Sequence, residues 1–236
     1  MSGILYIISA PSGSGKSTLV NEMRKFVSHL EFSISYTTRD PRGSEQNGRE
    51  YRFISREEFE AMIRNDEFLE YAQVFGNYYG TTKSVLQDAG RRGNDLLLDI
   101  DVQGERQVKA KMPDAVSIFV LPPSRSELES RLRKRSMSEN VHSEEVIRRR
   151  LATARREIEN YVNYDYILIN DRLEQSVDRL QAIVLGERIR RARNPTSPEE
   201  KRFLKTAEEC LKSRMEAEIR DILASFDDSS PDETQR

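Results

Sequence analysis

The 236-residue sequence contains a single cysteine, Cys210, and only a small excess of acidic residues. One cysteine excludes an internal disulfide and fits a reducing compartment. With 40 acidic and 38 basic residues, bulk charge gives no reason to expect a nucleic acid or a membrane as partner. No apolar run approaches the roughly 18 residues of a membrane span, and the first residues lack the pattern of a signal peptide. These absences predict a cytoplasmic protein.

A glycine-rich turn at residues 10–18 is the most informative stretch that is present. It joins an apolar run to an amphipathic segment, so backbone N–H groups and the positive end of a helix dipole converge on one spot that suits phosphates. Lys16 can reach the β- and γ-phosphates, and the Ser17 hydroxyl can ligate Mg²⁺. The usual pattern begins with glycine, where this sequence has Ala10. The residues of the predicted triphosphate site are Ala10, Pro11, Ser12, Gly13, Ser14, Gly15, Lys16, Ser17 and Thr18.

Predicted strands alternate with predicted helices, which is typical of a doubly wound α/β fold with a parallel sheet. The apolar runs that predict buried strands are residues 4–8, 95–101, 117–121 and 166–169. The shorter elements between residues 34 and 94 predict a small inserted subdomain. Within this part of the chain we expect one strand at 32–36, a helix opened by a capping box at Ser55 and Glu58, and a turn at 76–77.

The composition changes after residue 194. Ser197, Pro198 and Glu200 are a strong helix start. Apolar residues then recur at helical spacing, which predicts one amphipathic helix to about residue 226. Its apolar stripe packs either on the core of the chain or between two subunits of a homo-oligomer. The acidic and polar residues 227–236 are predicted to be disordered.

Four further motifs, at residues 35–42, 48–51, 76–81 and 99–104, together closely resemble those of guanylate kinases. The resemblance covers about residues 3–190. It implies a P-loop nucleoside monophosphate kinase fold with a parallel five-stranded core sheet flanked by helices, an inserted GMP-binding subdomain and a lid. The implied divisions are a core at 1–33 and 95–193 with a lid at about 125–158, a GMP-binding subdomain at 34–94, a helical extension at 194–226, and a tail at 227–236.

The resemblance implies reversible, Mg²⁺-dependent transfer of the γ-phosphoryl group of ATP to GMP or dGMP, in purine nucleotide metabolism and GMP recycling. Arginine forks and tyrosine hydroxyls suit the acceptor phosphate, and a carboxylate can accept from the two N–H donors of guanine. The positions that match the family's phosphate-binding residues are Arg39, Arg42, Tyr51 and Tyr79. The positions that match its base-contacting residues are Ser35, Glu70, Thr81 and Asp101. Without the motifs, the two arginines would be interpreted as a solvated face and Glu70 as a surface residue on an edge strand.

The resemblance also assigns residues around the donor. Asp99 would orient Mg²⁺ through water. Asn170 matches an adenine-contacting asparagine, although a plain turn asparagine fits nearly as well. The lid arginines would stabilise the charge of the transferring group, among other arginines that are solvated. The catalytic residues implied are Lys16, Arg39, Arg131, Arg135 and Arg150.

The segment at 136–142 is about four residues longer than the usual lid of the family, so the assignment of individual lid arginines stays open. A general base is not required, because the second pKa of a phosphate monoester is about 6. His29 and His142 have no polar constellation around them and are interpreted as surface residues.

The sequence leaves two alternatives. Guanylate kinase-like domains of scaffold proteins keep the fold but bind phosphorylated peptides without catalysis, and their phosphate loop is degraded. Here Lys16, Ser17 and Asp99 are all present, which favours an enzyme. A related kinase acting on another monophosphate would not need Ser35 and Glu70.

Overall fold

The computed structural model describes residues 3–74, 76–138, 144–192 and 197–227. The chain divides into two compact units, one made of Met1–Ser9 and Val27–Ser117 and the other of Ala10–Phe26 and Ile118–Arg236. His142 and most of the predicted tail lie outside the described residues. The division into core, GMP-binding subdomain, lid and extension is one of function and stays a prediction.

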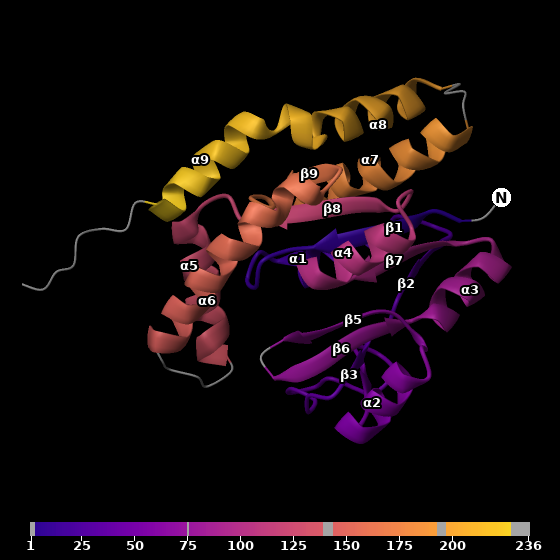
Figure 1. Cartoon of the computed structure of the whole chain (residues 1–236). Helices are drawn as coiled ribbons and strands as arrows, with labels where there is room; N and C mark the ends of the chain where they lie inside the picture. The colour runs from indigo at the N-terminus through magenta and orange to yellow at the C-terminus, as the bar shows by residue number, and fades with distance from the viewer. Residues whose placement is uncertain (1–2, 75, 139–143, 193–196, 228–236) are drawn as a thin grey trace, which may run out of the picture. The chain divides into compact units, whose positions relative to one another are not determined.

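Five strands have the order β2-β7-β1-β8-β9 (Figure 1), and every pairing within a unit is parallel. The predicted α/β fold with a five-stranded parallel sheet is therefore confirmed. Their bounds are β1 (Leu5–Ser9), β2 (Leu30–Phe32), β7 (Asp95–Asp99), β8 (Val116–Leu121) and β9 (Tyr166–Ile169). Strands β1 and β8 are buried along their whole length, as continuous apolar runs predict.

The first unit also holds a four-stranded sheet of order β4-β3-β6-β5, of which Figure 1 labels β3, β5 and β6. Its strands are β3 (Tyr36–Thr37), β4 (Arg52–Phe53), β5 (Phe68–Val74) and β6 (Asn77–Thr82). The helices of this unit are α2 (Arg56–Arg64), α3 (Lys83–Arg92) and α4 (Val102–Lys111). Helix α2 begins with the predicted capping box, in which Ser55 and Glu58 exchange hydrogen bonds.

The predicted single strand at 32–36 is wrong, because the chain changes sheets within it. The Ser33 N–H donates to the Leu97 carbonyl in the large sheet, whereas the Ser35 carbonyl accepts from Arg52 in the small one. The predicted turn at 76–77 is wrong in part, since Asn77 already begins β6. Both errors concern short strands, of two, three and six residues, whose existence depends on partners elsewhere in the chain.

The second unit contains the glycine-rich turn and most of the helices. Those up to residue 192 are α1 (Lys16–Met23), α5 (Arg125–Ser138), α6 (Glu144–Ile158), the 3₁₀ turn η1 (Glu159–Asn163) and α7 (Leu173–Ala192). The amphipathic segment after the glycine-rich turn predicts a helix over about residues 17–28. Helix α1 ends five residues earlier, at Met23, and 3₁₀-type bonds from Lys25 and Phe26 close its last turn. Within the described residues, no helix combines the length and the hydropathy needed to cross a membrane.

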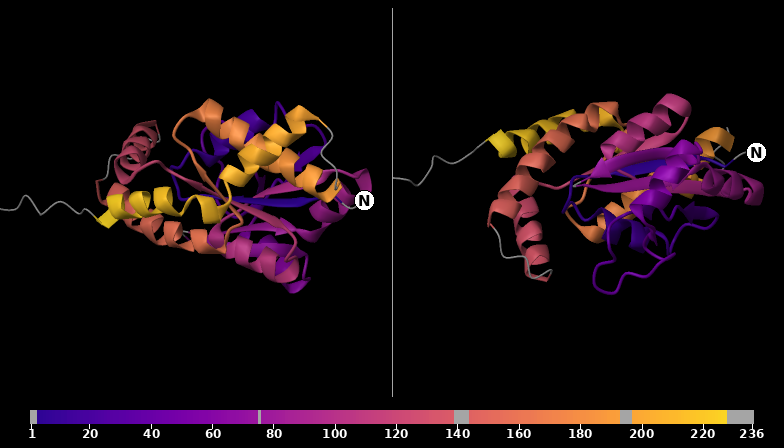
Figure 2. Two further views of the ribbon diagram at one scale, coloured as in Figure 1. Left: turned by 90° about the horizontal axis from the view of Figure 1, so that it is seen from above. Right: turned by 60° about the horizontal axis from the view of Figure 1, so that its bottom comes forward.

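The C-terminal helix predicted to be continuous is instead two helices, α8 (Pro198–Glu209) and α9 (Glu216–Asp227), separated by the short turn η2 (Lys212–Arg214). The break occurs where the chain pairs with the edge of the large sheet, since Ile167 N–H donates to the Cys210 carbonyl at 2.8 Å. The capping box at Ser197 is confirmed. Most of the apolar stripe is buried, whereas Leu204 and Leu211 are half-buried, and Figure 2 shows α8 lying beside α7.

Candidate functional site

The glycine-rich turn owes its conformation to two glycines. Gly13 and Gly15 have φ angles of 92° and 86°, in the left-handed region that disfavours side chains. A Cβ added to Gly13 would lie 2.9 Å from Leu132, and one added to Gly15 would lie 2.5 Å from the amide nitrogen of Asn170. Gly15 is the N-cap of α1 and offers no side chain to its first N–H groups. These groups are thus suited to bind an anion.

Asn170 and Arg131 hold this turn through the carbonyl of Ser14. The buried Asn170 side chain donates its Nδ2–H to that oxygen at 2.8 Å, and Arg131 Nη1 donates to it at 3.3 Å. Arg131 Nη2 also donates to the Asn170 carbonyl at 3.0 Å, while its Nε donates to Glu127 at 2.8 Å. Asn170, predicted to contact adenine, and Arg131, predicted to stabilise the transferring group, both lie at the phosphate turn and fix its backbone.

The side chains predicted to bind the triphosphate and Mg²⁺ lie in the first turn of α1. Lys16 is half-buried, whereas Ser17 and Thr18 are exposed. Asp99, which ends β7, is also exposed. Among the described residues there is no cluster of three or more His, Cys, Asp or Glu that could hold a metal ion. A hydroxyl and a carboxylate are hard oxygen donors, and this chemistry fits Mg²⁺ that is otherwise ligated by water and phosphate oxygens.

In the first unit, strand register brings the predicted base-contacting residues together. Glu70 on β5 is the antiparallel partner of Thr81 on β6, next to an irregularity in the pairing. The Oγ of Ser35 lies 3.3 Å from Oγ1 of Thr81, with either hydroxyl able to donate. All three side chains are buried, and Glu70 is only 3% exposed. The small sheet thus gathers one carboxyl and two hydroxyls.

Glu70 is a buried acceptor that is only partly satisfied. Its Oε1 has no hydrogen-bond partner among the described residues. Burial raises the pKa of Glu70 to about 7, the hydrogen bonds from Thr81 oppose the rise, and the charge of Asp101 adds to it. Gly104 makes room for the carboxyl, because a Cβ there would lie 2.5 Å from Oε2. A ligand that donates N–H groups would satisfy this carboxylate.

Asp101 lies at the start of α4 and caps that helix. Its Oδ1 accepts from the N–H groups of Gln103 at 3.0 Å and Gly104 at 2.8 Å. The half-buried carboxylate is therefore held by two backbone bonds. By fixing the first turn of α4, Asp101 also places Gly104 against Glu70.

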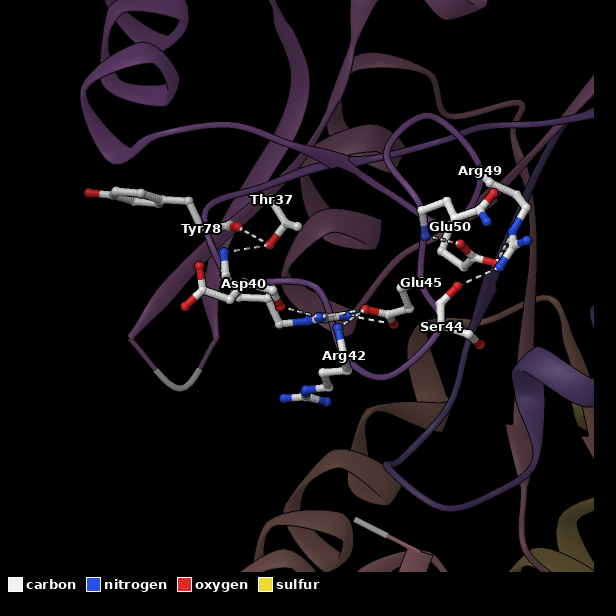
Figure 3. Close-up of polar contacts among 10 residues, drawn as sticks. Thr37, Asp40, Arg42, Ser44, Glu45, Arg49, Glu50 and Tyr78 are labelled. Carbon is white, nitrogen blue, oxygen red and sulfur yellow. Dashed lines mark hydrogen bonds and ion pairs between the residues drawn. The ribbon is translucent and has the colours of Figure 1, made fainter.

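Arg39 is buried and bound by a residue that the sequence analysis missed, Glu45. Arg39 Nη1 and Nη2 donate to the two Glu45 oxygens at 2.7 and 2.8 Å, and Arg42 N–H donates to the same carboxylate at 2.8 Å. Figure 3 shows Glu45 in the turn that carries Asp40 and Arg42. These hydrogen bonds raise the pKa of Arg39 and lower that of Glu45. The sequence signal that could have indicated this contact is the position of Glu45, an acid three residues after Arg42 in the same polar loop.

Two tyrosine rings lie close to the Arg39 guanidinium. The Arg39 guanidinium lies 5.0 Å from the centre of the Tyr51 ring, and the rings of Tyr51 and Tyr79 are 5.9 Å apart. Burial, followed by the nearby charge of Asp99, raises the pKa of Tyr51 to about 12. Tyr51 therefore remains a phenol and a hydrogen-bond donor at neutral pH. Arg42 is exposed.

The predicted lid arginines differ in their surroundings. Arg131 is bound to the phosphate turn, Arg135 is exposed on α5, and Arg150 is half-buried on α6. Arg133, which is not one of the predicted lid arginines, forms ion pairs with Glu129 on its own helix and with Glu144 on α6. Arg133 therefore ties α5 to α6.

Comparisons with known proteins agree on one family. A family model described as guanylate kinase matches residues 2–187. A guanylate kinase of Koribacter versatilis is 59% identical over 230 residues, covering 98% of each chain, and that of Escherichia coli K12 is 46% identical over 193 residues, covering 81% of this chain and 91% of its own. The crystal structure of guanylate kinase from Anaplasma phagocytophilum matches with a TM-score of 0.65 and 35% identity, over 79% of this chain and 86% of that chain. The chain belongs to the guanylate kinase family.

Proposed function

We propose that this guanylate kinase transfers the γ-phosphoryl group of Mg²⁺-bound ATP to GMP or dGMP. The observation that carries the proposal is the Glu70 carboxyl, which is 3% exposed and has an oxygen without a partner among the described residues. Guanine offers N1–H and an exocyclic amine side by side, so it suits such an acceptor. Adenine lacks the N1 proton and would leave the carboxylate unpaired.

The acceptor phosphate would bind to Arg39, Arg42, Tyr51 and Tyr79. Arg39 already has its planar fork oriented by a bidentate contact with Glu45, at 2.7 and 2.8 Å. The guanidinium is thereby held in one orientation before substrate binds, which reduces the ordering cost of binding. Ser35 and Thr81 would contact the O6 side of the base, and Asp101 would hold the helix that faces it.

The donor triphosphate would bind to the turn at residues 10–18, with Lys16 on the β- and γ-phosphates and the first N–H groups of α1 around them. Ser17 and Asp99 are the residues that would hold Mg²⁺, Asp99 through water. When bound, this ion neutralises phosphate charge and fixes the geometry of the triphosphate. Arg131, Arg135 and Arg150 would stabilise the charge on the transferring group.

Acid–base catalysis by a side chain is not part of this proposal. GMP carries a phosphate whose second pKa is about 6, so the attacking oxygen is already largely ionised at pH 7. The protein's contribution is to orient the acceptor and to neutralise charge. An adenine contact by Asn170 stays a prediction, and its amide nitrogen already has a partner in Ser14.

The test is ADP production from ATP and Mg²⁺ with GMP, dGMP, IMP, AMP, CMP and UMP offered separately. Turnover is expected with GMP and dGMP. IMP keeps N1–H but lacks the exocyclic amine, so the loss of one hydrogen bond to a charged group, worth about 1.5–3 kcal/mol, is expected to lower kcat/KM by about 10- to 150-fold. Faster turnover with another monophosphate would overturn the assignment of Glu70. An absence of turnover with all six would favour the phosphopeptide-binding alternative.

A further inference from the structure

The helices α8 and α9, with the turn between them, form an addition to the family domain that we call the C-terminal extension (residues 197–227). It lies beyond residues 2–187, which the family model matches. The alignment with the Koribacter versatilis protein covers 98% of both chains, so that relative has a chain of similar length. The extension is therefore shared with at least one relative and needs an explanation of its own.

The extension is fastened to the outer strand of the large sheet. Backbone hydrogen bonds join Ile167 N–H to the Cys210 carbonyl at 2.8 Å and Lys212 N–H to the Asp165 carbonyl at 3.1 Å. Helix α8 packs closely on α7, where a Cβ on Gly186 would lie 3.1 Å from the Cβ of Ala207. These contacts give α9 a fixed starting point beside β9.

From this anchor, α9 reaches both helices of the predicted lid, as Figures 1 and 2 show. The Arg125 N–H at the start of α5 donates to Ser225 Oγ at 3.1 Å. Asp227 forms an ion pair with Arg155 on α6. Phe226, between these two contacts, is only 6% exposed. The extension therefore supplies part of the N-terminal cap of α5 and a charged contact to α6.

The helices that α9 contacts carry the lid arginines. Helix α5 bears Arg131 and Arg135, and α6 bears Arg150. The ion pairs of Arg133 with Glu129 and Glu144 tie the two helices to each other. A constraint applied to the start of α5 and to α6 therefore acts on all three arginines.

We propose that Ser225 and Asp227 are positioning residues for phosphoryl transfer. They hold the base of the lid helices and thereby set the placement of the arginines that stabilise the transferring group. The proposal rests on the proposed function, because it assumes that these arginines act in transfer. It assigns the extension a role in the chemical step, and GMP binding should be independent of it.

The test compares Ser225→Ala, the conservative Ser225→Thr, Asp227→Lys, Arg155→Glu and the charge exchange Arg155→Glu/Asp227→Lys in the full chain. Asp221→Asn, an exposed acid on the same helix, is the matched control. We expect Ser225→Ala, Asp227→Lys and Arg155→Glu each to lower kcat about two- to fivefold, with the KM for GMP unchanged. These modest changes reflect one hydrogen bond and a solvent-exposed ion pair. Ser225→Thr and the charge exchange should restore kcat, and Asp221→Asn should match the original chain.

Melting temperatures of all variants are measured alongside. Variants that melt earlier but keep the original kcat would overturn the proposal and leave the extension as a stabilising addition only. A charge exchange no more active than the single variants would overturn the role of the Arg155–Asp227 pair. If the unaltered chain fails to phosphorylate GMP, the proposed function itself is wrong. This outcome differs from an active chain whose variants all keep the original kcat.

Discussion

Replacing Glu70 by glutamine removes one titrating group from the buried end of the small sheet while keeping its shape. Burial raises the pKa of Glu70 from its ordinary value of 4.5 to about 7. The folded chain therefore holds this proton more tightly than the unfolded chain. The stabilisation is complete below about pH 4.5 and is lost as the pH rises through 7.

The magnitude follows from the two pKa values. Integrating the proton linkage from pH 5 to pH 8 gives a loss of about 2.5 kcal/mol in the free energy of unfolding of the original chain, which Glu70→Gln does not suffer. All other groups titrate equally in both proteins. The difference in unfolding free energy between variant and original should therefore shift by this amount in favour of the variant. Urea denaturation at several pH values measures it, followed by circular dichroism because the chain has no tryptophan.

A difference that stays constant within about 0.5 kcal/mol over this range would refute the reasoning, because a shifted, buried carboxyl must produce the linkage. The same variant tests recognition of the base. At pH 8 the loss of a charge-assisted acceptor should weaken GMP binding about 10- to 150-fold, measured by calorimetry. The ratio of the two dissociation constants should shrink toward pH 5, because protonation removes the carboxylate from the original chain as well. Titration of the GMP phosphate affects both proteins alike and cancels.

Two other substitutions, one of them paired with a control, should each change the KM for only one of the two substrates. Gly104→Ala puts a Cβ 2.5 Å from Glu70 Oε2 and should raise the KM for GMP at least tenfold with the KM for ATP unchanged, whereas Gly90→Ala, with open space around it, should alter neither. Equal effects of the two substitutions on the KM for GMP would contradict the proposed role of the close approach between Gly104 and Glu70. Asn170→Ala removes the 2.8 Å bond to the Ser14 carbonyl, which keeps its bond from Arg131. The loss of about 0.5–1.5 kcal/mol should raise the KM for ATP several-fold while sparing that for GMP. A lower melting temperature with unchanged KM for ATP would limit Asn170 to stability.

The features that could be predicted from the sequence depend on short-range signals. The glycine-rich turn was identified by its neighbours along the chain, and the left-handed angles of Gly13 and Gly15 agree with the role given to them. The capping boxes at Ser55 and Ser197 are formed between residues three apart. The buried parallel strands follow from continuous apolar runs.

The features that could not be predicted depend on residues far apart in the chain. The bond from Asn170 to Ser14 spans 156 residues, and no local pattern indicates it. The fit of Gly104 around the Glu70 carboxyl arises only when α4 packs on β5. Arg39 was predicted to bind phosphate, but its bidentate contact with Glu45 requires the fold of a turn with little regular structure.

The broken C-terminal helix shows why periodicity alone is insufficient. Apolar spacing continues across the break, with Ala207 before it and Met215 and Ile219 after it all buried, so the pattern is that of one helix. The break supplies partners to the exposed edge of β9, where a continuous helix would leave Ile167 N–H without the Cys210 carbonyl. The same pairing fixes where α9 starts and thus which lid groups it can contact. If α9 positions the lid, weakening this edge pairing should lower kcat in the same way as removing the Ser225 hydroxyl.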